Sequence, residues 1–268
     1  MKIFTRLVAV CAALALSLSA HASVDNLLPK PVSVTASNAG DFAKGGEVAL
    51  TDPTASVMLQ EFADMCGYTV SATAMRAIEV QMVTSIPGAE DYELKGFENE
   101  AYAISVSTDK ITVKAVTRTG VTRAAATLMQ LAEGATAIPS VEIIDWPAFK
   151  LRGFMHDVGR SFVSLDEIKK EIKMYARFKV NCFHWHLTEN QAWRFEVKQY
   201  PQLTDASSMT RFAGLYYTQE ECREIDQLCH DYGVVLIPEI DMPGHSGAFE
   251  RAMGHSMQTA QGVTELQN

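Results

Sequence analysis

Three clusters of polar residues, each placed where a short apolar run ends, constrain the second half of this chain more than any other feature. The clusters lie in residues 154–160, 183–189 and 236–245. Each run has the composition of a β-strand, and helical patterns follow at least the first two clusters. In parallel α/β proteins, ligands bind at the carboxyl ends of the strands. We therefore expect one site assembled from these three strand ends.

The order of elements in the second half is typical of a parallel sheet. Strands are predicted over residues 153–158, 180–187 and 234–240, and the third is apolar on both faces, as a buried parallel strand should be. Capping sequences at 164–167 (SLDE) and 218–221 (TQEE) start the two intervening helices. Alternating strands and helices favour a parallel sheet. The sequence has no glycine-rich phosphate loop, which weakens a nucleotide-binding interpretation.

Residues 23–146 are predicted to form a separate, small α+β domain. Alternating runs on either side of Thr108-Asp109-Lys110 predict a hairpin, and a sheet with helices on one face explains the order of elements. No catalytic constellation stands out here, so we interpret this domain as a scaffold or docking module. The predicted elements are strands at 48–50, 77–84, 101–107 and 111–116, and helices that start at Pro53 and span 121–131.

The amino terminus has the pattern of a secretory signal peptide. Lys2 and Arg6 precede an apolar stretch over residues 7–18, and Ala20-His21-Ala22 fits a cleavage site before Ser23. The apolar stretch is shorter than a membrane span, and an uncleaved anchor is the alternative. We expect residues 1–22 to be removed and the protein to be exported, to the periplasm or to the extracellular space. No other stretch of the sequence predicts a membrane span.

The charge and the cysteines exclude some classes of partner and of fold. The chain has 23 basic and 32 acidic residues and a net charge of −9, which falls to −11 when the two basic residues of the leader are removed. An acidic surface disfavours nucleic acid as a partner. The cysteine spacing gives no disulfide framework, so we expect buried free thiols at Cys66, Cys182, Cys222 and Cys229. We expect no cofactor, and the sequence does not specify an oligomeric state.

Arg160 and a histidine pair are the first candidates for chemistry at the strand ends. The guanidinium of Arg160 offers a fork of donors that suits vicinal hydroxyls or a carboxylate, and the alternative is an ordinary salt-bridged arginine. His184 and His186 point to one face of their strand because they lie two residues apart. Such a pair can bind a metal, or it can be hydrogen-bonded in the core. The candidates for further metal ligands are Asp157, Asp241 and His245.

Glu189 and His245 form a second pair of candidates. Glu189 follows the second strand, and Asp241 and His245 follow the third. A carboxylate bonded to one ring nitrogen fixes the tautomer of a histidine, so we predict that Glu189 and His245 pair across adjacent strands. Asp241 is expected to accept from a ligand or to orient its loop. Aromatic residues near this edge can pack on a sugar or belong to the core; they are Trp185, Trp193, Phe195, Tyr216 and Tyr217.

Together these stretches resemble glycoside hydrolase family 20, the β-N-acetylhexosaminidases. The matching motifs are RGFMHDVGRSF at 152–162, KVNCFHWHLTENQAWR at 179–194, YYT at 216–218 and IPEIDMPGHS at 237–246. The resemblance implies an α/β fold in which residues 147–268 form the first three βα units of an incomplete (β/α)8 TIM-type barrel. Residues 23–146 resemble the small α+β domain that precedes the barrel in this family.

The resemblance implies an exo-acting enzyme that releases terminal N-acetylglucosamine or N-acetylgalactosamine from β-linked glycans. Arg160 matches the arginine that grips hydroxyls of the terminal sugar, and Trp193 is expected beside that sugar. Glu189 matches an aspartate that is linked through the histidine at His245 toward the acid machinery, and Asp241 lies in the matching third motif. The attacking group in this family is the acetamido oxygen of the substrate. We expect Asp157 and His186 to position these residues from behind rather than to contact the sugar.

Two departures from the family pattern bear on activity. The sequence has Glu189-Asn190 where the family usually has two aspartates, which moves the carboxylate by about one methylene. The family also has an adjacent Asp-Glu pair after the fourth strand, where the aspartate orients the acetamido group and the glutamate protonates the leaving oxygen. Beyond Gly247 the sequence contains no such pair. We therefore expect these 268 residues to lack hydrolase activity alone and to be marginally stable or to associate.

Two other functions remain as alternatives. One is a metal-dependent barrel hydrolase that uses His184 and His186, for which bound metal and chelator-sensitive activity would be the evidence. The other is a non-catalytic sugar-binding protein that keeps Arg160 and the aromatic residues, for which tight binding without turnover would be the evidence.

Overall fold

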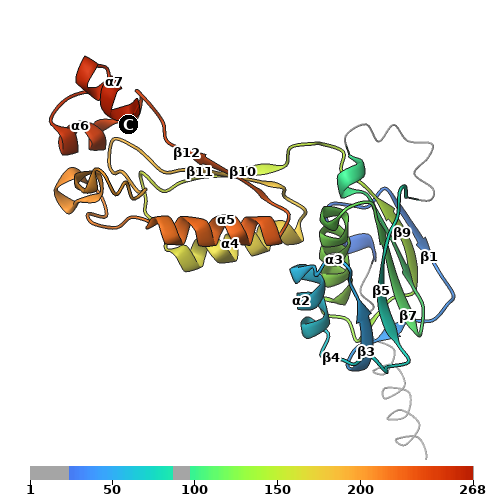
Figure 1. Ribbon diagram of the computed structural model, residues 1–268. Coiled ribbons are helices and arrows are strands. Elements are labelled where there is room, and N and C mark those ends of the chain that lie inside the picture. The colour runs from blue at the N-terminus through green and yellow to red at the C-terminus, as the bar shows by residue number, and fades with distance from the viewer. Residues whose placement is uncertain (1–23, 87–96, 268) are drawn as a thin grey trace, which may run out of the picture. The chain divides into compact units, whose positions relative to one another are not determined.

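The computed structural model describes residues 24–86 and 97–267, so the predicted signal peptide over residues 1–22 lies outside the described residues. The chain divides into two compact units, Met1–Lys150 and Leu151–Asn268 (Figure 1). Among the helices in the described ranges, none is long and apolar enough to span a membrane.

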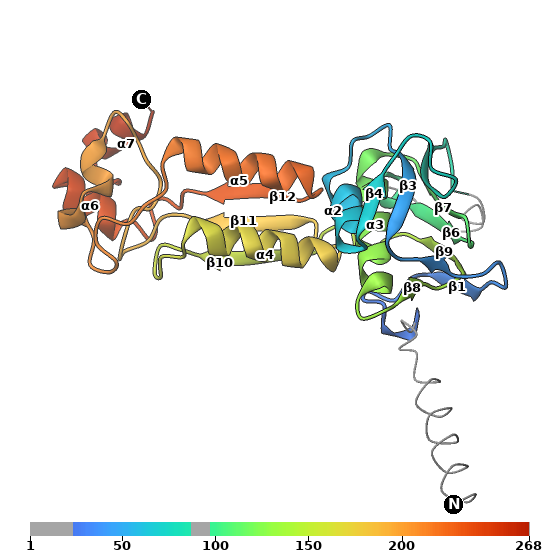
Figure 2. The same ribbon diagram turned by 90° about the horizontal axis from the view of Figure 1, so that it is seen from below.

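The first unit is built on a mixed seven-stranded sheet with the strand order β1-β9-β6-β7-β5-β3-β4. Two helices, α2 (Val57–Met65) and α3 (Arg118–Ala132), pack together on one face of this sheet (Figures 1 and 2). The strands are β1 (Ser33–Ala36), β3 (Gly46–Thr51), β4 (Tyr68–Val70), β5 (Ala77–Met82), β6 (Tyr102–Val106), β7 (Lys110–Ala115) and β9 (Val141–Asp145). The smaller elements are a pair of strands, β2 (Phe42–Ala43) and β8 (Ala137–Ile138), and two 3₁₀ turns, η1 (Val24–Asn26) and η2 (Glu98–Glu100).

Both helices of this unit begin at a different residue from the predicted one. The helix expected at Pro53 begins at Val57, because the Asp52 carboxylate accepts hydrogen bonds from the backbone N–H groups of Thr54 (2.9 Å) and Ser56 (2.6 Å) and holds a turn there. The helix expected from residue 121 begins at Arg118, because the Thr117 hydroxyl caps it. The predicted hairpin is present as the antiparallel pair β6 and β7.

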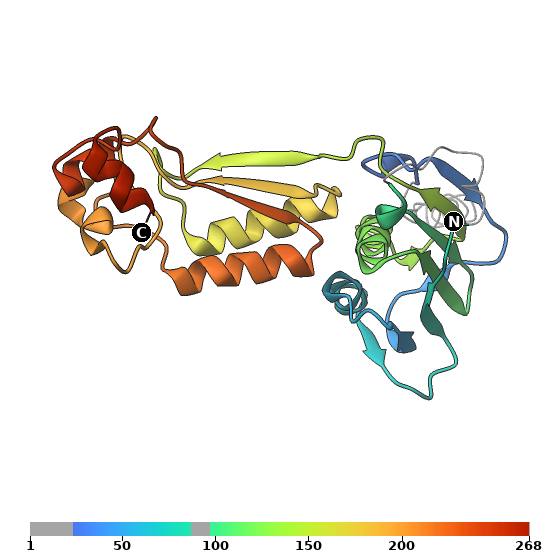
Figure 3. The same cartoon turned by 45° about the horizontal axis from the view of Figure 1, so that its top comes forward.

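The second unit has the predicted βαβαβ order. Its three strands are parallel, with β11 (Cys182–His186) between β10 (Gly153–Asp157) and β12 (Val235–Glu239). Two helices, α4 (Leu165–Arg177) and α5 (Gln219–Asp231), lie along one face of the strands (Figure 3). The other elements are η3 (Pro201–Thr204), η4 (Ala206–Ser208), α6 (Gly247–Met253) and α7 (Ala260–Gln267).

The two predicted capping boxes differ in the structure. Thr218 and Glu221 form the full reciprocal box at the start of α5, with the Thr218 N–H donating to Glu221 Oε2 at 2.7 Å. Ser164 accepts from the backbone of Glu167, but the Glu167 carboxylate pairs with Lys170 at 2.7 Å. Only one arm of the predicted box is therefore seen at the start of α4.

The prediction that the third strand is buried on both faces is wrong. Aromatic stacking closes the helix-covered face, where the Phe154 and Phe183 rings lie 4.7 Å apart. On the opposite face, Val235 is 63% exposed and Ile237 is 44% exposed. β12 is an edge strand of the three-stranded sheet, and its apolar sequence does not reveal whether a neighbour covers it.

Candidate functional site

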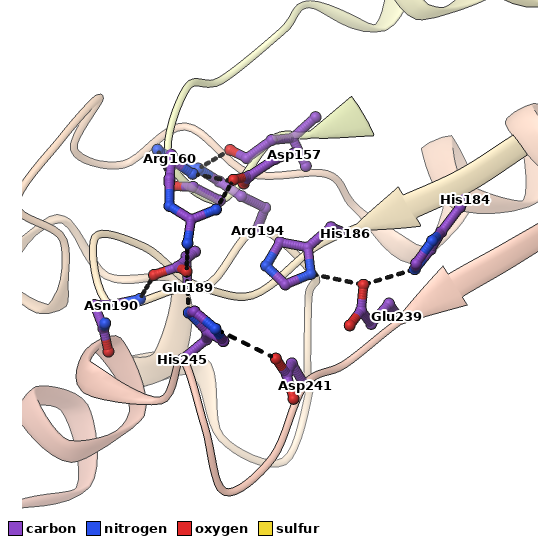
Figure 4. A network of polar contacts seen from close by, with 12 residues as sticks. Asp157, Arg160, His184, His186, Glu189, Asn190, Arg194, Glu239, Asp241 and His245 are labelled. Atoms are coloured by element: carbon purple, nitrogen blue, oxygen red, sulfur yellow. Dashed lines mark hydrogen bonds and ion pairs between the residues drawn. The ribbon is translucent and has the colours of Figure 1, made fainter. Parts of the chain in front are cut away.

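The three strand ends bring the predicted residues together at one edge of the second unit. Asp157, His186 and Glu239 occupy equivalent positions on the three strands, because the parallel register pairs them side by side. Glu189 follows β11, and His245 lies in the loop after β12 (Figure 4). This edge is the carboxyl edge of the sheet, where the sequence predicts a site.

Glu189 lies at the centre of the site. It is 1% exposed, and its Oε1 atom forms ion pairs with Arg160 Nη2 at 2.5 Å and with His245 Nδ1. The angles of these contacts fall outside hydrogen-bond geometry, whereas Oε2 accepts a hydrogen bond from the Asn190 N–H. The pairing of Glu189 with His245 is the one that the sequence predicts.

A glycine allows the loop after β10 to approach Glu189 this closely. A Cβ atom at Gly159 would lie 2.6 Å from Glu189 Cβ, closer than non-bonded carbon atoms can come. The absence of a side chain at residue 159 therefore lets Arg160, the next residue, reach the Glu189 carboxylate.

Arg160 is held between two carboxylates and remains accessible. Its Nη1 pairs with the Asp157 carboxylate, and its backbone N–H donates to Asp157 Oδ1 at 3.0 Å. Burial alone would raise the pKa of Asp157, but the hydrogen bonds and charge of Arg160 outweigh it and hold that pKa below its ordinary value. The Arg160 side chain is 47% exposed, so its guanidinium is fixed in direction while part of it faces solvent.

The loop after β12 presents His245 to Glu189. His245 adopts a left-handed backbone conformation with φ at 51°, and its Nε2 lies 3.9 Å from Asp241 Oδ2. Side chains that follow β11 fasten this loop: Thr188 Oγ1 accepts from the Asp241 N–H, and Asn190 Oδ1 accepts from the Gly247 N–H, both at 3.0 Å. Hydrogen bonds between backbone N–H groups and side-chain oxygens thus tie the second and third strand-end motifs together.

Glu239 is a site residue that the sequence analysis missed. Its Oε2 contacts His184 Nε2 at 2.6 Å and His186 Nδ1 at 2.7 Å. Burial opposes ionisation of Glu239, yet the hydrogen bonds and charges of His186 and His184 keep the pKa of Glu239 below its ordinary value. The sequence shows only that Glu239 ends its strand, and the register of the folded sheet places it beside His186.

Arg194 is a second residue that the sequence analysis missed, and it acts behind the site. It is fully buried, and burial lowers the pKa of its guanidinium to about 10. Its hydrogen bonds tie the long segment after β11 to the backbone immediately before Arg160. The accepting carbonyl oxygens belong to Val158 (3.0 Å), Arg211 (2.9 Å), Phe212 (2.9 Å) and Leu215 (2.7 Å).

Trp193 is placed in the interior of the second unit. It is 4% exposed, its ring packs 6.3 Å from that of Phe249, and its indole N–H donates to the Phe195 carbonyl at 2.7 Å. Trp185 and Tyr217 are also buried, with their rings 4.7 Å apart. These aromatic residues serve the core, and contact of Trp193 with a sugar stays a prediction.

A parallel βαβαβ unit with a polar network at its carboxyl edge places this protein among the parallel α/β proteins that bind ligands at that edge. Two family models match the sequence. The model of the glycosyl hydrolase family 20 catalytic domain matches residues 149–268, and that of family 20 domain 2 matches residues 25–146. The chain belongs to glycosyl hydrolase family 20.

Curated relatives agree with this assignment. The chain is 53% identical over 117 residues to a β-hexosaminidase of Porphyromonas gingivalis. The aligned region covers 41% of this chain and 15% of the relative. The chain is 40% identical over 170 residues to a β-hexosaminidase of Vibrio furnissii, covering 57% and 28%. It is 30% identical over 250 residues to the N,N'-diacetylchitobiase of Vibrio harveyi, covering 83% and 27%. The chain thus spans less than a third of each of these relatives.

Solved structures confirm the predicted fold. A family 20 exo-β-N-acetylglucosaminidase of Vibrio harveyi in complex with N-acetylglucosamine matches with a TM-score of 0.69 at 29% identity, over 87% of this chain and 38% of that one. The N-acetyl-β-hexosaminidase of Streptomyces plicatus matches with a TM-score of 0.71 at 28% identity, over 84% and 48%. The chain is therefore a small α+β domain followed by part of a TIM-type barrel.

Proposed function

We propose that the protein containing this chain is an exported, exo-acting β-N-acetylhexosaminidase that releases terminal N-acetylglucosamine or N-acetylgalactosamine from β-linked glycans. The observation that carries this proposal is the position of Arg160, which is half exposed and held by Asp157 and Glu189 while Glu189 also contacts His245. The names of the relatives support the same substrate class.

Arg160 binds hydroxyls of the terminal sugar in this proposal. A guanidinium has five N–H donors in a fixed plane, and two carboxylates already fix the direction of this one. Little side-chain entropy is lost when a sugar binds to such a preorganised group. The donors that face solvent are then available to adjacent hydroxyls.

Glu189 and His245 set the polarity of the site. The Glu189 carboxylate at Nδ1 favours a proton on that nitrogen and leaves Nε2 directed toward Asp241 (Figure 4). Glu189 takes the place of the family's aspartate in this proposal. Its longer side chain still reaches both Arg160 and His245, and the space left by Gly159 accommodates its stem.

The reaction is proposed to be substrate-assisted and to retain the anomeric configuration. The acetamido oxygen bonds to the anomeric carbon while the glycosidic C–O bond breaks, and an acid donates a proton to the leaving oxygen. Water then opens the cyclic intermediate. The residues beyond Gly247 in this sequence include no adjacent Asp-Glu pair for the orienting and acid roles. We therefore propose that the polypeptide 23–268 does not turn over substrate by itself.

Release of p-nitrophenol from p-nitrophenyl N-acetyl-β-glucosaminide tests the activity. The complete gene product should hydrolyse this substrate and should not hydrolyse the matching β-glucoside, which has no acetamido oxygen. The polypeptide 23–268 should give a rate equal to that of buffer. Equal rates on both sugars would contradict the assisted mechanism, and turnover by 23–268 would contradict the assignment of the missing pair.

Export has its own test. Fractionation of the source cells should place the protein outside the cytoplasm, and amino-terminal sequencing should begin at Ser23. An intact Met1 on a cytoplasmic protein would contradict export without affecting the proposed activity.

A further inference from the structure

We propose that His186, Glu239 and Asp241 form a binding site for one divalent transition-metal ion. Each side chain offers one ligand atom, and these three atoms lie within 4.8 Å of one another. The proposal concerns binding and is independent of the proposed hydrolase activity.

The ligand set matches the chemistry of zinc and its neighbours in the first transition series. Imidazole nitrogen and carboxylate oxygen bind Zn²⁺ at about 2.0–2.2 Å, and three protein ligands with an open fourth position are typical of an accessible zinc site. A tetrahedral centre places its ligand atoms about 3.4 Å apart, a spacing that follows from those bond lengths. Ligand atoms at the 4.8 Å limit therefore need to approach one another by about 1.4 Å, whereas His186 Nδ1 and Glu239 Oε2, now 2.7 Å apart, need to separate by about 0.7 Å.

The burial of the three side chains permits this movement. His186 is 5% exposed and holds a fixed position in the central strand, whereas the side chains of Glu239 and Asp241 are 29% and 30% exposed. The two carboxylates can rotate toward the histidine without displacing a packed core. A cation between His186 Nδ1 and Glu239 Oε2, now 2.7 Å apart, would replace the proton that joins them, and that proton would move to His186 Nε2, which no described residue contacts by a hydrogen bond.

Neighbouring residues already orient the proposed ligands. His184 Nε2 contacts Glu239 Oε2 at 2.6 Å, and Thr188 Oγ1 accepts from the backbone N–H of Asp241 at 3.0 Å. The contact of His184 is made to the proposed ligand carboxylate and orients it, which increases metal affinity, whereas the Thr188 bond fixes the backbone that carries Asp241. Figure 4 shows the Glu239 carboxylate directed at both histidines and the Asp241 carboxylate directed at His245.

The charge around the cluster also favours a cation. Arg160 pairs with Asp157 and Glu189, so its positive charge is committed to those two carboxylates. Glu239 and Asp241 face histidines instead. A divalent ion at the cluster would offset both of these remaining negative charges.

A zinc titration of the full chain tests the proposal. The protein is prepared without a polyhistidine tag, treated with a chelator, and titrated with Zn²⁺ by isothermal calorimetry. We expect one site with a Kd of about 1 μM or tighter. Because the set contains an imidazole, Mg²⁺ and Ca²⁺ should bind at least tenfold more weakly than Zn²⁺.

Three variants identify the ligands. His186→Asn, Glu239→Gln and Asp241→Asn should each weaken Zn²⁺ binding by about 10–100-fold. The matched controls are His156→Asn and Glu171→Gln, which alter a histidine–carboxylate pair of the same type, 2.8 Å apart, elsewhere in the unit. Both controls should bind Zn²⁺ as the unaltered chain does.

Spectroscopy distinguishes the loss of the metal site from the loss of the fold. Co²⁺ added to the unaltered chain should give visible absorption bands of a tetrahedral or five-coordinate centre, and Asp241→Asn should need about 10–100-fold more Co²⁺ to reach the same absorbance. Circular dichroism confirms that each variant is folded, and the partly exposed Asp241 decides the result if His186→Asn fails to fold. The proposal is overturned if the chain shows no saturable Zn²⁺ binding, or if folded Asp241→Asn binds Zn²⁺ as tightly as the controls.

Discussion

Arg123 in the first unit and Arg194 in the second are both buried arginines, but their charges are balanced in different ways. The Arg123 side chain is 2% exposed, and its Nε donates to Glu100 Oε2 at 2.6 Å. Arg194 is 0% exposed, and its hydrogen bonds within the described ranges go to carbonyl oxygens and to the Met209 sulfur. One cation is paired with an anion, and the other is surrounded by backbone dipoles.

The difference between the two arginines reflects the different roles of the polar networks to which they belong. In the first unit, buried polar groups contact one another in the interior, as when the Tyr102 hydroxyl donates to Asp145 at 2.8 Å. In the second unit, Arg194 fixes the backbone at Val158 and so supports a half-exposed Arg160 at the sheet edge. The polar network of the first unit is structural, whereas that of the second supports a group that can contact a ligand.

The largest effect is expected from Arg123→Met in the first unit. The substitution removes the cation and leaves the Glu100 carboxylate, 14% exposed, without this partner. Breaking a buried ion pair on one side costs about 3–5 kcal/mol, so the free energy of unfolding of this unit should fall by that amount. Hydrogen exchange measured by mass spectrometry should speed up over α3 and β6 and stay unchanged in the second unit. Exchange that also changes around Glu189 would contradict the separation of the two networks.

The next effect is expected from Arg160→Lys in the second unit. Lysine keeps the charge near Asp157 and Glu189 but loses the planar fork that suits adjacent hydroxyls. In the complete gene product, kcat/KM should fall about 100-fold, equivalent to about 2.7 kcal/mol, while stability changes by less than about 1 kcal/mol. The control is Arg223→Lys on α5, where the arginine is exposed and paired with Glu220. A large loss of stability without loss of activity would show that Arg160 is structural.

A smaller effect is expected from Arg194→Lys. An ammonium has three N–H donors for the four carbonyl groups to which the guanidinium donates at 2.7–3.0 Å, so one buried carbonyl is left without a donor at a cost of about 1–3 kcal/mol. We expect the backbone amides of residues 209–217 to exchange faster, with little change in α5. Unchanged exchange in this segment would show that Arg194 does not hold it.

The sequence predicts the parts of this molecule that depend on local patterns. Apolar runs and capping residues locate all three parallel strands, and the strand period places His184 and His186 on one face. Strand ends meet at one edge in any parallel sheet, so the proximity of Glu189 and His245 follows from their positions alone.

Features that depend on the three-dimensional neighbours could not be predicted in the same way. Glu239 looks like a strand-end carboxylate until the register places it beside His186. Arg194 resembles a surface residue in sequence, and only the fold brings loop carbonyls around it. The exposure of Val235 was missed because an apolar strand does not encode whether a neighbour covers its face.

The smallest effect is expected in the acid stability of the Asp157–Arg160 pair, compared with that of Glu79–Lys110 on the first unit's sheet. The pKa of Asp157 is lower in the folded chain than its ordinary value of 3.8, so its contribution to stability is fully present above that pH and is lost as the pH falls further. Because Arg160 is half exposed, this contribution should stay below about 1 kcal/mol. Asp157→Asn should therefore lower the melting temperature of the second unit at pH 6 by a few degrees or less, and the difference should shrink as the pH falls below 3.8.

The exposed pair of the first unit makes the comparison quantitative. Hydrogen bonds from Gln81 and Lys110, with the charge of Lys110, lower the pKa of Glu79, but the carboxylate is well solvated on the sheet surface. Solvent screening should remove most of its contribution, so Glu79→Gln should leave the melting temperature unchanged over the same pH range. If both substitutions changed the melting temperature equally at acid pH, the position of Asp157 at the strand ends would give its ion pair no additional strength. If only Asp157→Asn shifted it, the partly buried edge would be the place where this chain concentrates its electrostatic interactions.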